Sequence, residues 1–417
     1  MKEIASTLTA KGNSCRFCGG ELHQFLDLGV SPLCESYLSA EQLSAPETFY
    51  PLVASVCHDC LLVQLPEHVA PVDIFTEYAY FSSYSDDWLA HARRYVDDMT
   101  NRLGLGPSSH VVELGSNDGY LLQYFVKKGL SVLGIDPAAN VAEAAEARGV
   151  RTLVGFFGAD IANRVAAEDK KADLIIGNNV LAQVSDINDF VEGVRILLKQ
   201  GGTATFEFPH IAQTLNGNQF DQFYHEHYSY FSAISIEKIM AAHGLQLFDV
   251  ERLSTHGGSL RIYVRHADGA DRVKPAVDEL LAAERDLGLH QLAAYDAFAE
   301  RVAQTKRKLL SFLIHARSAG ASVVGYGAPG KGNTLLNYCG IRTDFLDYTV
   351  DRNPYKHGKY LPGTRIPIFP PEKIAETKPQ YVLILPWNLK DEIAKQLAYV
   401  GNWGGQLVVP IPEVKFY

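Results

Sequence analysis

Apolar residues recur along this chain with two different periods. Short apolar runs at residues 110–114, 131–135 and 172–176 each end in Gly, Asp or Asn, as is typical of buried parallel strands. The stretch at 120–128 has helical spacing, and longer helical spacing extends from about residue 273 to 319. A second strand-and-turn series then opens at 321–327. The alternation predicts an α/β protein with doubly wound parallel sheets.

Length and charge narrow the class of protein. The chain has 417 residues, which is enough for two or three domains, and 47% of them are hydrophobic. The formal net charge is −10 and no basic run is present, which argues against a nucleic-acid partner. The first residues lack the apolar core of a signal peptide, and no apolar stretch is long enough to span a membrane. We therefore expect a cytoplasmic protein without a membrane partner. No interface signature stands out in the sequence, which is compatible with a monomer but does not determine the quaternary state.

Four of the six cysteines form two C-x-x-C pairs near the N-terminus: Cys15 with Cys18, and Cys57 with Cys60. Each pair can present two thiolates from a tight turn, and together they complete a tetrahedral zinc site. Four protein ligands leave no position for a substrate, so we expect a structural Zn²⁺ ion. The alternative is a set of reduced core thiols. Cys34 and Cys339 have no partner nearby in the sequence and are expected to be buried.

A glycine-rich turn follows the first predicted strand of the middle part, and it reads E-x-G-x-x-x-G from Glu113 to Gly119. This turn carries carboxylates and departs from the G-x-G-x-x-G pattern that cradles a pyrophosphate. A ligand with an ammonium group and no phosphate fits it better, and S-adenosylmethionine (SAM) is such a ligand. Asp136 ends the next strand, about 20 residues on, where a carboxylate can accept both hydroxyls of a ribose.

Ligands of doubly wound sheets bind at the carboxyl ends of the strands. The candidate cofactor residues are Gly115, Asn117, Asp118, Gly119, Asp136 and Asn178, with Phe156 as a candidate to pack on adenine. The glycines alone would be equally compatible with ordinary turns.

Two segments are unusually rich in aromatic and polar side chains. The first runs from Tyr78 to Trp88, and the second, residues 223–231, holds Tyr224, His225, Glu226 and His227. An imidazole can act as a general base near neutral pH when a carboxylate orients it, and a phenol can donate a hydrogen bond to a developing enolate oxygen. A packed, tyrosine-rich turn or a stray metal site is the alternative.

The last third contains G-x-G-x-x-G at Gly325, Gly327 and Gly330, followed by Lys331. The P-loop pattern fails here because Gly332 offers no hydroxyl to magnesium. The pattern instead indicates a phosphate-bearing ligand at a helix N-terminus, with Lys331 as its charge partner. Asn333 and Arg352 belong to the segments that would complete this pocket.

These motifs together resemble those of the SAM-dependent C-methyltransferases that act on C-3 of nucleotide-linked 4-keto sugars in deoxysugar pathways, including antibiotic biosynthesis. The resemblance spans nearly the whole chain. It implies a zinc-binding module at residues 1–70, a Rossmann-like SAM methyltransferase domain at 71–280 and a Rossmann-like sugar-nucleotide domain at 281–417. Its most specific pieces are residues 78–83, 113–119, 206–210, 224–227, 256–261 and 325–334.

The resemblance also implies the roles of individual residues. His227 would remove the C-3 proton with support from Glu226, while Tyr224 and Tyr78 would position the enolate and the methyl group. The substrate would be a nucleotide sugar, most simply a dTDP-linked one. Gln183 replaces a histidine that such enzymes often carry, so any acid/base duty at that position is absent.

Two other interpretations stay open at this point. The first keeps the base and the enolate but transfers no methyl group, as a 3-epimerase-like or other SAM-site enzyme would, and Gln183 motivates it. The second is a zinc-stabilised, NAD-binding regulatory or scaffolding protein, which the glycine pattern at Gly325 motivates.

Overall fold

The computed structural model describes residues 14–76, 81–269 and 272–417, which form two compact units. Unit 1 contains the described residues up to Leu22, then Cys57–His210 and Tyr228–His290. Unit 2 contains His23–Val56, Ile211–His227 and Gln291–Tyr417. Both units are therefore assembled from separate stretches of chain. The boundaries proposed from the sequence, at about residues 70 and 280, stay a prediction.

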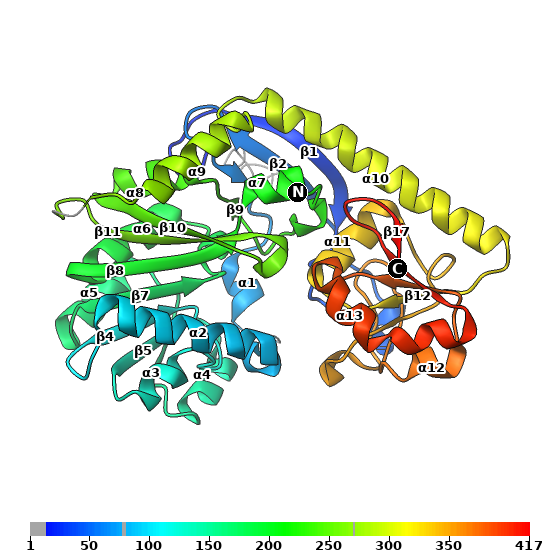
Figure 1. Cartoon of the computed structure of the whole chain (residues 1–417), viewed down its shortest axis with the longest axis horizontal. Coiled ribbons are helices and arrows are strands. Elements are labelled where there is room, and N and C mark those ends of the chain that lie inside the picture. Colours follow the sequence, from blue (N-terminus) through cyan, green and yellow to red (C-terminus); the bar gives the residue numbers. More distant parts are fainter. Residues whose placement is uncertain (1–13, 77–80, 270–271) are drawn as a thin grey trace, which may run out of the picture. The chain divides into compact units, whose positions relative to one another are not determined.

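A seven-stranded sheet forms the centre of unit 1 (Figure 1). Its order is β10-β11-β8-β7-β4-β5-β6; the last five are parallel, whereas β11 runs antiparallel to both β10 and β8. The strands are β4 (His110–Leu114), β5 (Ser131–Asp136), β6 (Thr152–Val154), β7 (Ala172–Asn178), β8 (Leu198–Pro209), β10 (Leu245–Leu253) and β11 (Ser259–His266). The parallel strands predicted from the apolar runs are confirmed.

Seven helices accompany this sheet: α2 (Asp86–Leu103), α3 (Leu122–Lys127), α4 (Ala139–Glu146), α5 (Ala159–Glu168), α6 (Ile187–Leu197), α8 (Ala233–Ala242) and α9 (Pro275–Asp286). Helix α2 shows why they pack as they do. Ala92, Tyr95, Val96 and Met99 follow helical spacing and are buried in one cluster with β4 and α3. The Ser85 side chain caps its start, and Gly104, with a φ of 59°, ends it.

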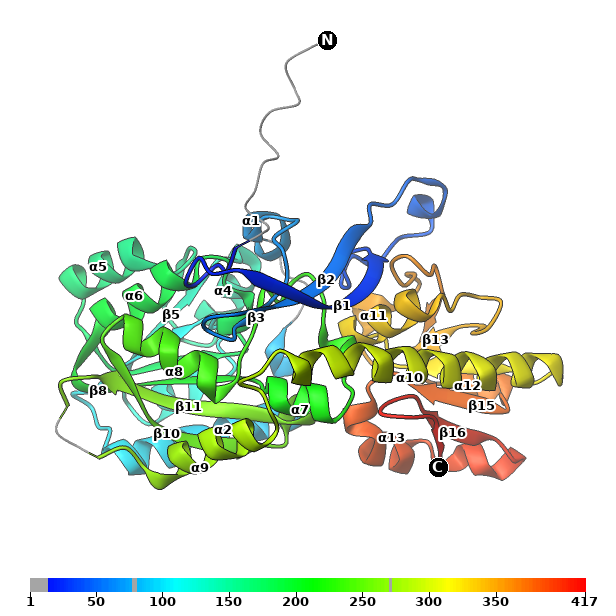
Figure 2. The same ribbon diagram turned by 90° about the horizontal axis from the view of Figure 1, so that it is seen from above.

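Unit 1 also contains a short antiparallel pair, β3 (Val63–Gln64) and β9 (Ser229–Tyr230), and the short helix α1 (Pro71–Phe75). In unit 2, β1 (Leu22–Ser31) and β2 (Tyr50–Cys57) lie side by side, as the blue strands of Figure 2 show. Short 3-10 helices occur at Glu41–Ser44, Ser82–Tyr84, Leu181–Gln183, Phe220–Gln222, Thr255–Gly257, Pro354–Lys356, Trp387–Leu389 and Ala398–Trp403.

A second, six-stranded sheet forms the centre of unit 2, in the order β14-β13-β12-β15-β16-β17. All neighbours are parallel except β17, which runs antiparallel to β16. The strands are β12 (Val323–Tyr326), β13 (Thr349–Val350), β14 (Ile368–Phe369), β15 (Tyr381–Ile384), β16 (Gln406–Val409) and β17 (Lys415–Phe416). The helices are α7 (Ile211–Asn216), α10 (Ala293–Ser318), α11 (Gly330–Cys339), α12 (Lys373–Thr377) and α13 (Lys390–Gln396). The predicted second α/β series is confirmed.

Candidate active site

The glycine-rich turn of unit 1 leaves the carboxyl end of β4. Gly115 has a φ of 65°, and its N–H donates to the Ile135 carbonyl at 2.8 Å. A Cβ atom at this position would lie 3.1 Å from the Val180 side chain, so both the backbone conformation and the available space favour glycine. Asn117, in the same turn, also has a positive φ, of 47°. The turn thus has a defined conformation at the carboxyl ends of the strands, where ligands of such folds bind.

Asp136 fixes this turn from the neighbouring strand. Its Oδ2 accepts the Asn117 N–H at 2.8 Å, and its Oδ1 accepts the Ala138 N–H at 2.9 Å. Burial raises the pKa of Asp136, although these two hydrogen bonds lower it. Each carboxylate oxygen has a second lone pair, so the acid can hold the turn and still accept ribose hydroxyls.

Asn178 and Phe156 lie at or just after the ends of β7 and β6, the strands that flank β4 and β5 in the sheet. Asn178 ends β7 and donates from Nδ2 to the Tyr120 hydroxyl at 3.4 Å; its buried Oδ1 has no partner within the described residues. Phe156 follows β6, and 46% of its surface is exposed. One acceptor and one aromatic face are therefore available to a ligand at this edge.

The side chains of Asn117 and Asp118 hold two serines, Ser82 and Ser83, within the aromatic segment 78–88. Asn117 Oδ1 accepts the Ser82 N–H at 2.9 Å, and Asp118 Oδ2 accepts the Ser83 hydroxyl and pairs with Arg148 at 3.1 Å. Asp118 is fully buried. The structure thus shows these two polar residues joining the turn to the aromatic segment. Tyr78 lies outside the described residues.

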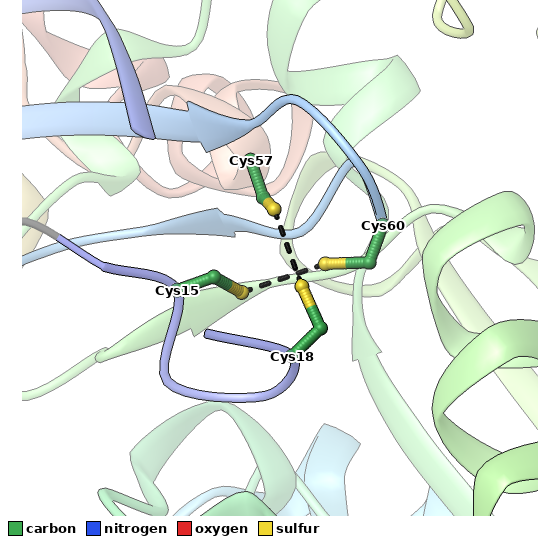
Figure 3. Close-up of side chains that lie close together, drawn as sticks. All are labelled: Cys15, Cys18, Cys57 and Cys60. Atoms are coloured by element: carbon green, nitrogen blue, oxygen red, sulfur yellow. Dashed lines mark hydrogen bonds between the residues drawn. The ribbon is translucent and has the colours of Figure 1, made fainter. Parts of the chain in front are cut away.

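The four cysteines of the two C-x-x-C pairs converge in unit 1 (Figure 3). Their sulfur atoms all lie within 4.8 Å of one another, with 3.5 Å between Cys15 and Cys60 and 3.4 Å between Cys18 and Cys57. A tetrahedral Zn²⁺ ion with bonds of about 2.3 Å requires sulfur separations of roughly 3.8 Å. The hydrogen bond from Cys60 lowers the pKa of Cys15 to about 5, which favours a thiolate within the cluster. The donor set and its spacing fit zinc.

In unit 2, the segment after α7 brings Tyr224 and His227 together. The Tyr224 hydroxyl lies 3.2 Å from His227 Nε2, and their ring centroids are 4.4 Å apart. The His227 N–H donates to the Tyr224 carbonyl at 3.0 Å, which closes a tight turn and keeps the two rings adjacent. His227 is buried and Tyr224 half-buried. The phenol and the imidazole therefore form one hydrogen-bonded pair.

Glu226 points to a different neighbour. The Cys34 thiol donates to Glu226 Oε1 at 3.5 Å, and the Cys34 carbonyl accepts Asn333 Nδ2 at 2.6 Å. Burial, reinforced by the charge of Glu35, raises the pKa of Glu226 to about 8. Cys34 thus joins two predicted site residues, Glu226 and Asn333, from distant parts of the sequence. The support of His227 by Glu226 stays a prediction.

The start of α11 carries Lys331, which is half-buried and donates to Asn388 Oδ1 at 2.8 Å. Its charge acts on the fully buried Asp221, which accepts a 2.7 Å hydrogen bond from Trp387 Nε1. Burial raises the pKa of Asp221 to about 6, although Lys331 and Trp387 lower it. Lys331 therefore lies close to the segment that continues to Tyr224. Arg352 is exposed and lies 3.9 Å from Glu392.

Asp351 repeats in unit 2 the arrangement of Asp136 in unit 1. Its Oδ2 accepts the Ala328 N–H at 2.7 Å, and its Oδ1 accepts the Asn353 N–H at 2.8 Å. The N–H of Gly327, which has a φ of 88°, donates to the Val350 carbonyl at 2.6 Å. Each unit therefore has a glycine turn that an acid at the end of the next strand holds in place.

Gln183 lies in unit 1, at the end of the 3-10 helix Leu181–Gln183, and is half-buried. Its N–H donates to the Val180 carbonyl at 2.8 Å. It thus follows Asn178, which ends β7, by five residues.

Three family models match consecutive parts of this chain. Residues 15–75 match a model described as "Putative zinc binding domain", residues 88–250 match "Methyltransferase domain", and residues 254–412 match "C-methyltransferase C-terminal domain". The C-methyltransferase NovU of Streptomyces niveus is 38% identical over 407 residues, which is 96% of each chain. This chain belongs to the C-methyltransferase family.

Shorter matches and fold comparisons involve other methyltransferases. A ubiquinone biosynthesis O-methyltransferase of Chelativorans sp. is 30% identical over 93 residues, 22% of this chain and 37% of that protein. Magnesium protoporphyrin IX methyltransferase of Synechocystis, with bound SAM, is 16% identical, with a TM-score of 0.33, 43% of this chain covered and 81% of that one. A SAM-dependent methyltransferase of Anabaena variabilis is 14% identical, with a TM-score of 0.35, 42% of this chain covered and 84% of that one.

This C-methyltransferase uses SAM and structural zinc, as expected from its turns and cysteines. Its residues fit both groups. The glycine turn with Asp136 and the free Asn178 oxygen suits SAM, and the four convergent sulfur atoms suit zinc. Among the described helices, none combines the length and apolar character of a membrane span.

Glu207, which none of the motif arguments singles out, lies at the centre of a polar cluster in unit 1. The fully buried acid accepts hydrogen bonds from His91, Arg261 and Thr255, each at 2.9 Å. Burial alone would raise its pKa, but the hydrogen bond and charge of His91 and the charge of Arg261 lower it to about 2. A single acid between Phe206 and Phe208, in the apolar end of β8, is the sequence signal that could have revealed this cluster.

Proposed function

We propose that this C-methyltransferase transfers the methyl group of SAM to C-3 of a nucleotide-linked 4-keto-deoxysugar, most simply a dTDP sugar, in deoxysugar and antibiotic biosynthesis in the cytoplasm. The hydrogen-bonded pair of Tyr224 and His227 is the observation that supports this most. An imidazole thus lies next to a hydroxyl group in the unit that also carries Lys331 and Asn333, which is the pair of groups that this chemistry needs.

His227 takes the C-3 proton on Nε2, and the electron pair moves onto the 4-keto oxygen as an enolate. The Tyr224 hydroxyl, which contacts Nε2 before the reaction, turns its single proton to that oxygen as Nε2 takes the substrate proton. Bound SAM supplies an electrophilic methyl group and leaves as S-adenosylhomocysteine. A positioned base contributes roughly 10² to 10⁴ in rate, and an oxyanion donor about 3 kcal/mol.

The ligands are assigned to the two glycine turns by their chemistry. The carboxylate-lined turn of unit 1, with Asp136, Asn178 and Phe156, suits the ammonium, ribose and adenine of SAM. The start of α11, with Lys331 and Asn333, suits the diphosphate of the sugar nucleotide, because a helix N-terminus and a lysine both favour anions. Arg352 is exposed, and its long side chain can leave Glu392 to reach the same ligand.

The direct test is incubation with SAM and a dTDP-4-keto-6-deoxyhexose. The expected product is heavier than the substrate by about 14 mass units, because a methyl group replaces one proton. NMR should place the new methyl group on C-3. A 4-ketone acidifies both neighbouring carbons, so a methyl group on C-5 would overturn the regiochemistry and leave the enolate mechanism intact. Absence of methyl transfer to any nucleotide-linked 4-keto sugar would overturn the proposal.

Gln183 supports one second candidate, the same enolate chemistry without methyl transfer. A glutamine cannot exchange a proton with the substrate, so the outcome of the enolate can differ from that of relatives with histidine. Deuterium incorporation from D₂O at C-3, without the gain of about 14 mass units that results when a methyl group replaces a proton, would favour this candidate.

A further inference from the structure

The first zinc turn is anchored in unit 1 by Arg16, which lies between the ligands Cys15 and Cys18. Its guanidinium donates to the Ser185 carbonyl at 3.2 Å and to the Leu65 carbonyl. Its Cζ lies 5.4 Å from the ring centroid of Tyr228. One side chain of the zinc turn therefore contacts three separate segments of unit 1, and two of them, at Ser185 and Tyr228, lie within the residues that match the methyltransferase domain.

The backbone of the same turn is also held. Asn188 Nδ2, on α6, donates to the carbonyls of Arg16 at 3.4 Å and Phe17 at 2.9 Å. The Arg16 N–H donates to Gln64 Oε1 at 3.1 Å. With its cysteines on a metal, this turn is a rigid support for the guanidinium.

Tyr228 connects Arg16 to two other segments. The ring is 1% exposed, and its hydroxyl donates to the Val69 carbonyl at 3.0 Å. Its N–H donates to the Ala182 carbonyl at 2.8 Å, and its own carbonyl accepts the Leu65 N–H at 3.0 Å. Every polar group of Tyr228 is thus engaged, so the residue has one well-defined position.

Two of the predicted site residues are covalent neighbours of Tyr228 and of its hydrogen-bond partner Ala182. His227 immediately precedes Tyr228, and Gln183 immediately follows Ala182. We propose that Arg16 is a positioning residue, which sets the placement of His227 and Gln183 through Tyr228. The zinc module then has a part in the reaction geometry besides its part in folding. The roles of His227 and Gln183 in this inference rest on the proposed function.

Arginine suits this position better than lysine. A planar guanidinium can donate to two carbonyls at once and still lie against an aromatic ring, whereas an ammonium is a point charge. Arg16→Lys therefore keeps the charge and most of the size but loses the geometry. Arg16→Ala removes both.

Lys238 provides a matched control. It lies on α8 and donates from Nζ to the Asp59 carbonyl at 2.7 Å, so it also ties a zinc knuckle to unit 1. None of the contacts described for Tyr228 involves it. Lys238→Ala therefore removes a comparable anchor without changing the contacts of Tyr228.

The test uses full-length protein with ¹³C-labelled histidine, in which His227→Gln assigns the imidazole signal of His227 in the NMR spectrum. Arg16→Ala and Arg16→Lys should shift or broaden this signal, while Lys238→Ala leaves it in place. Zinc content and the Kd for SAM should stay within about twofold of wild type, and kcat should fall about 10- to 100-fold in the Arg16 variants only.

An unchanged His227 signal in both Arg16 variants would overturn the inference. So would an equal shift in Lys238→Ala, or loss of zinc in both Arg16 variants, because the effect would then come from the metal site. If Arg16→Ala does not fold, Arg16→Lys alone decides. If the wild type methylates no nucleotide sugar, the proposed function fails, and the NMR comparison still decides whether Arg16 positions His227.

Discussion

The Tyr224 hydroxyl lies 3.2 Å from His227 Nε2, within a turn closed by a hydrogen bond from the His227 N–H to the Tyr224 carbonyl. Tyr224→Phe keeps the ring and removes the hydroxyl. Loss of one donor at a developing enolate should lower kcat by about 10² to 10³. The Kd for SAM should not change. Tyr399→Phe, on a helical turn of the same unit, serves as the control, and equal kcat values for the two variants would contradict the role of Tyr224.

Asp136 and Asp351 allow a reciprocal test, because each holds a glycine turn through two backbone N–H groups. Hydrogen bonds to a charged group contribute about 1.5 to 3 kcal/mol, so Asn at either position should weaken binding about tenfold or more. Asp136→Asn should raise the Kd for SAM and leave that for dTDP unchanged, whereas Asp351→Asn should do the reverse. Calorimetric titration measures both constants. Loss of SAM affinity in Asp351→Asn alone would mean that the two turns are wrongly assigned.

Removal of zinc should destabilise this protein by several kcal/mol, because a structural zinc site contributes folding free energy directly. Cys18 is the exposed ligand, so Cys18→Ser should release the metal with the least disturbance of the core. Denaturant unfolding with parallel zinc determination measures the effect. Cys339→Ala, which changes a buried thiol outside the cluster, is the control for general loss of packing. A metal-free Cys18→Ser protein with the wild-type unfolding midpoint would rule out the structural role.

Glu226 should make stability depend on pH. Its pKa of about 8 in the fold exceeds the ordinary value of 4.5, so between these values the folded state binds more protons than the unfolded state. The free energy of unfolding should therefore fall as pH rises from about 5 to 8, by on the order of 3 kcal/mol from this group. Glu226→Gln should flatten this dependence. Parallel pH profiles for wild type and Glu226→Gln, measured by denaturant unfolding, would contradict the raised pKa.

Local patterns in the sequence predict the elements that carry this site, because strands, turns and C-x-x-C pairs depend on residues close to each other in the chain. The apolar run 110–114 becomes β4, Gly115 takes the positive φ expected of its turn, and Asp136 ends β5. The four cysteines converge as their spacing predicts.

Contacts between distant residues leave no such pattern. Cys34 is buried, as expected, but the sequence does not show that it contacts Glu226, 192 positions away, or that its carbonyl accepts a hydrogen bond from Asn333. Arg16 in the zinc turn packs on Tyr228. Asn117 and Asp118 stay predicted cofactor residues, and the structure adds contacts of their side chains with Ser82 and Ser83 that the sequence does not indicate. Tertiary packing alone decides these partners, so neither period nor spacing reveals them.

The most direct test of the account is proton exchange at C-3 of the 4-keto sugar. Wild-type protein, given a dTDP-4-keto-6-deoxyhexose and S-adenosylhomocysteine in D₂O, should incorporate deuterium at C-3 without forming product. His227→Ala should abolish this exchange, slowing it at least about 100-fold, and bind SAM with nearly wild-type affinity. Exchange at the wild-type rate in His227→Ala would show that another group removes the proton.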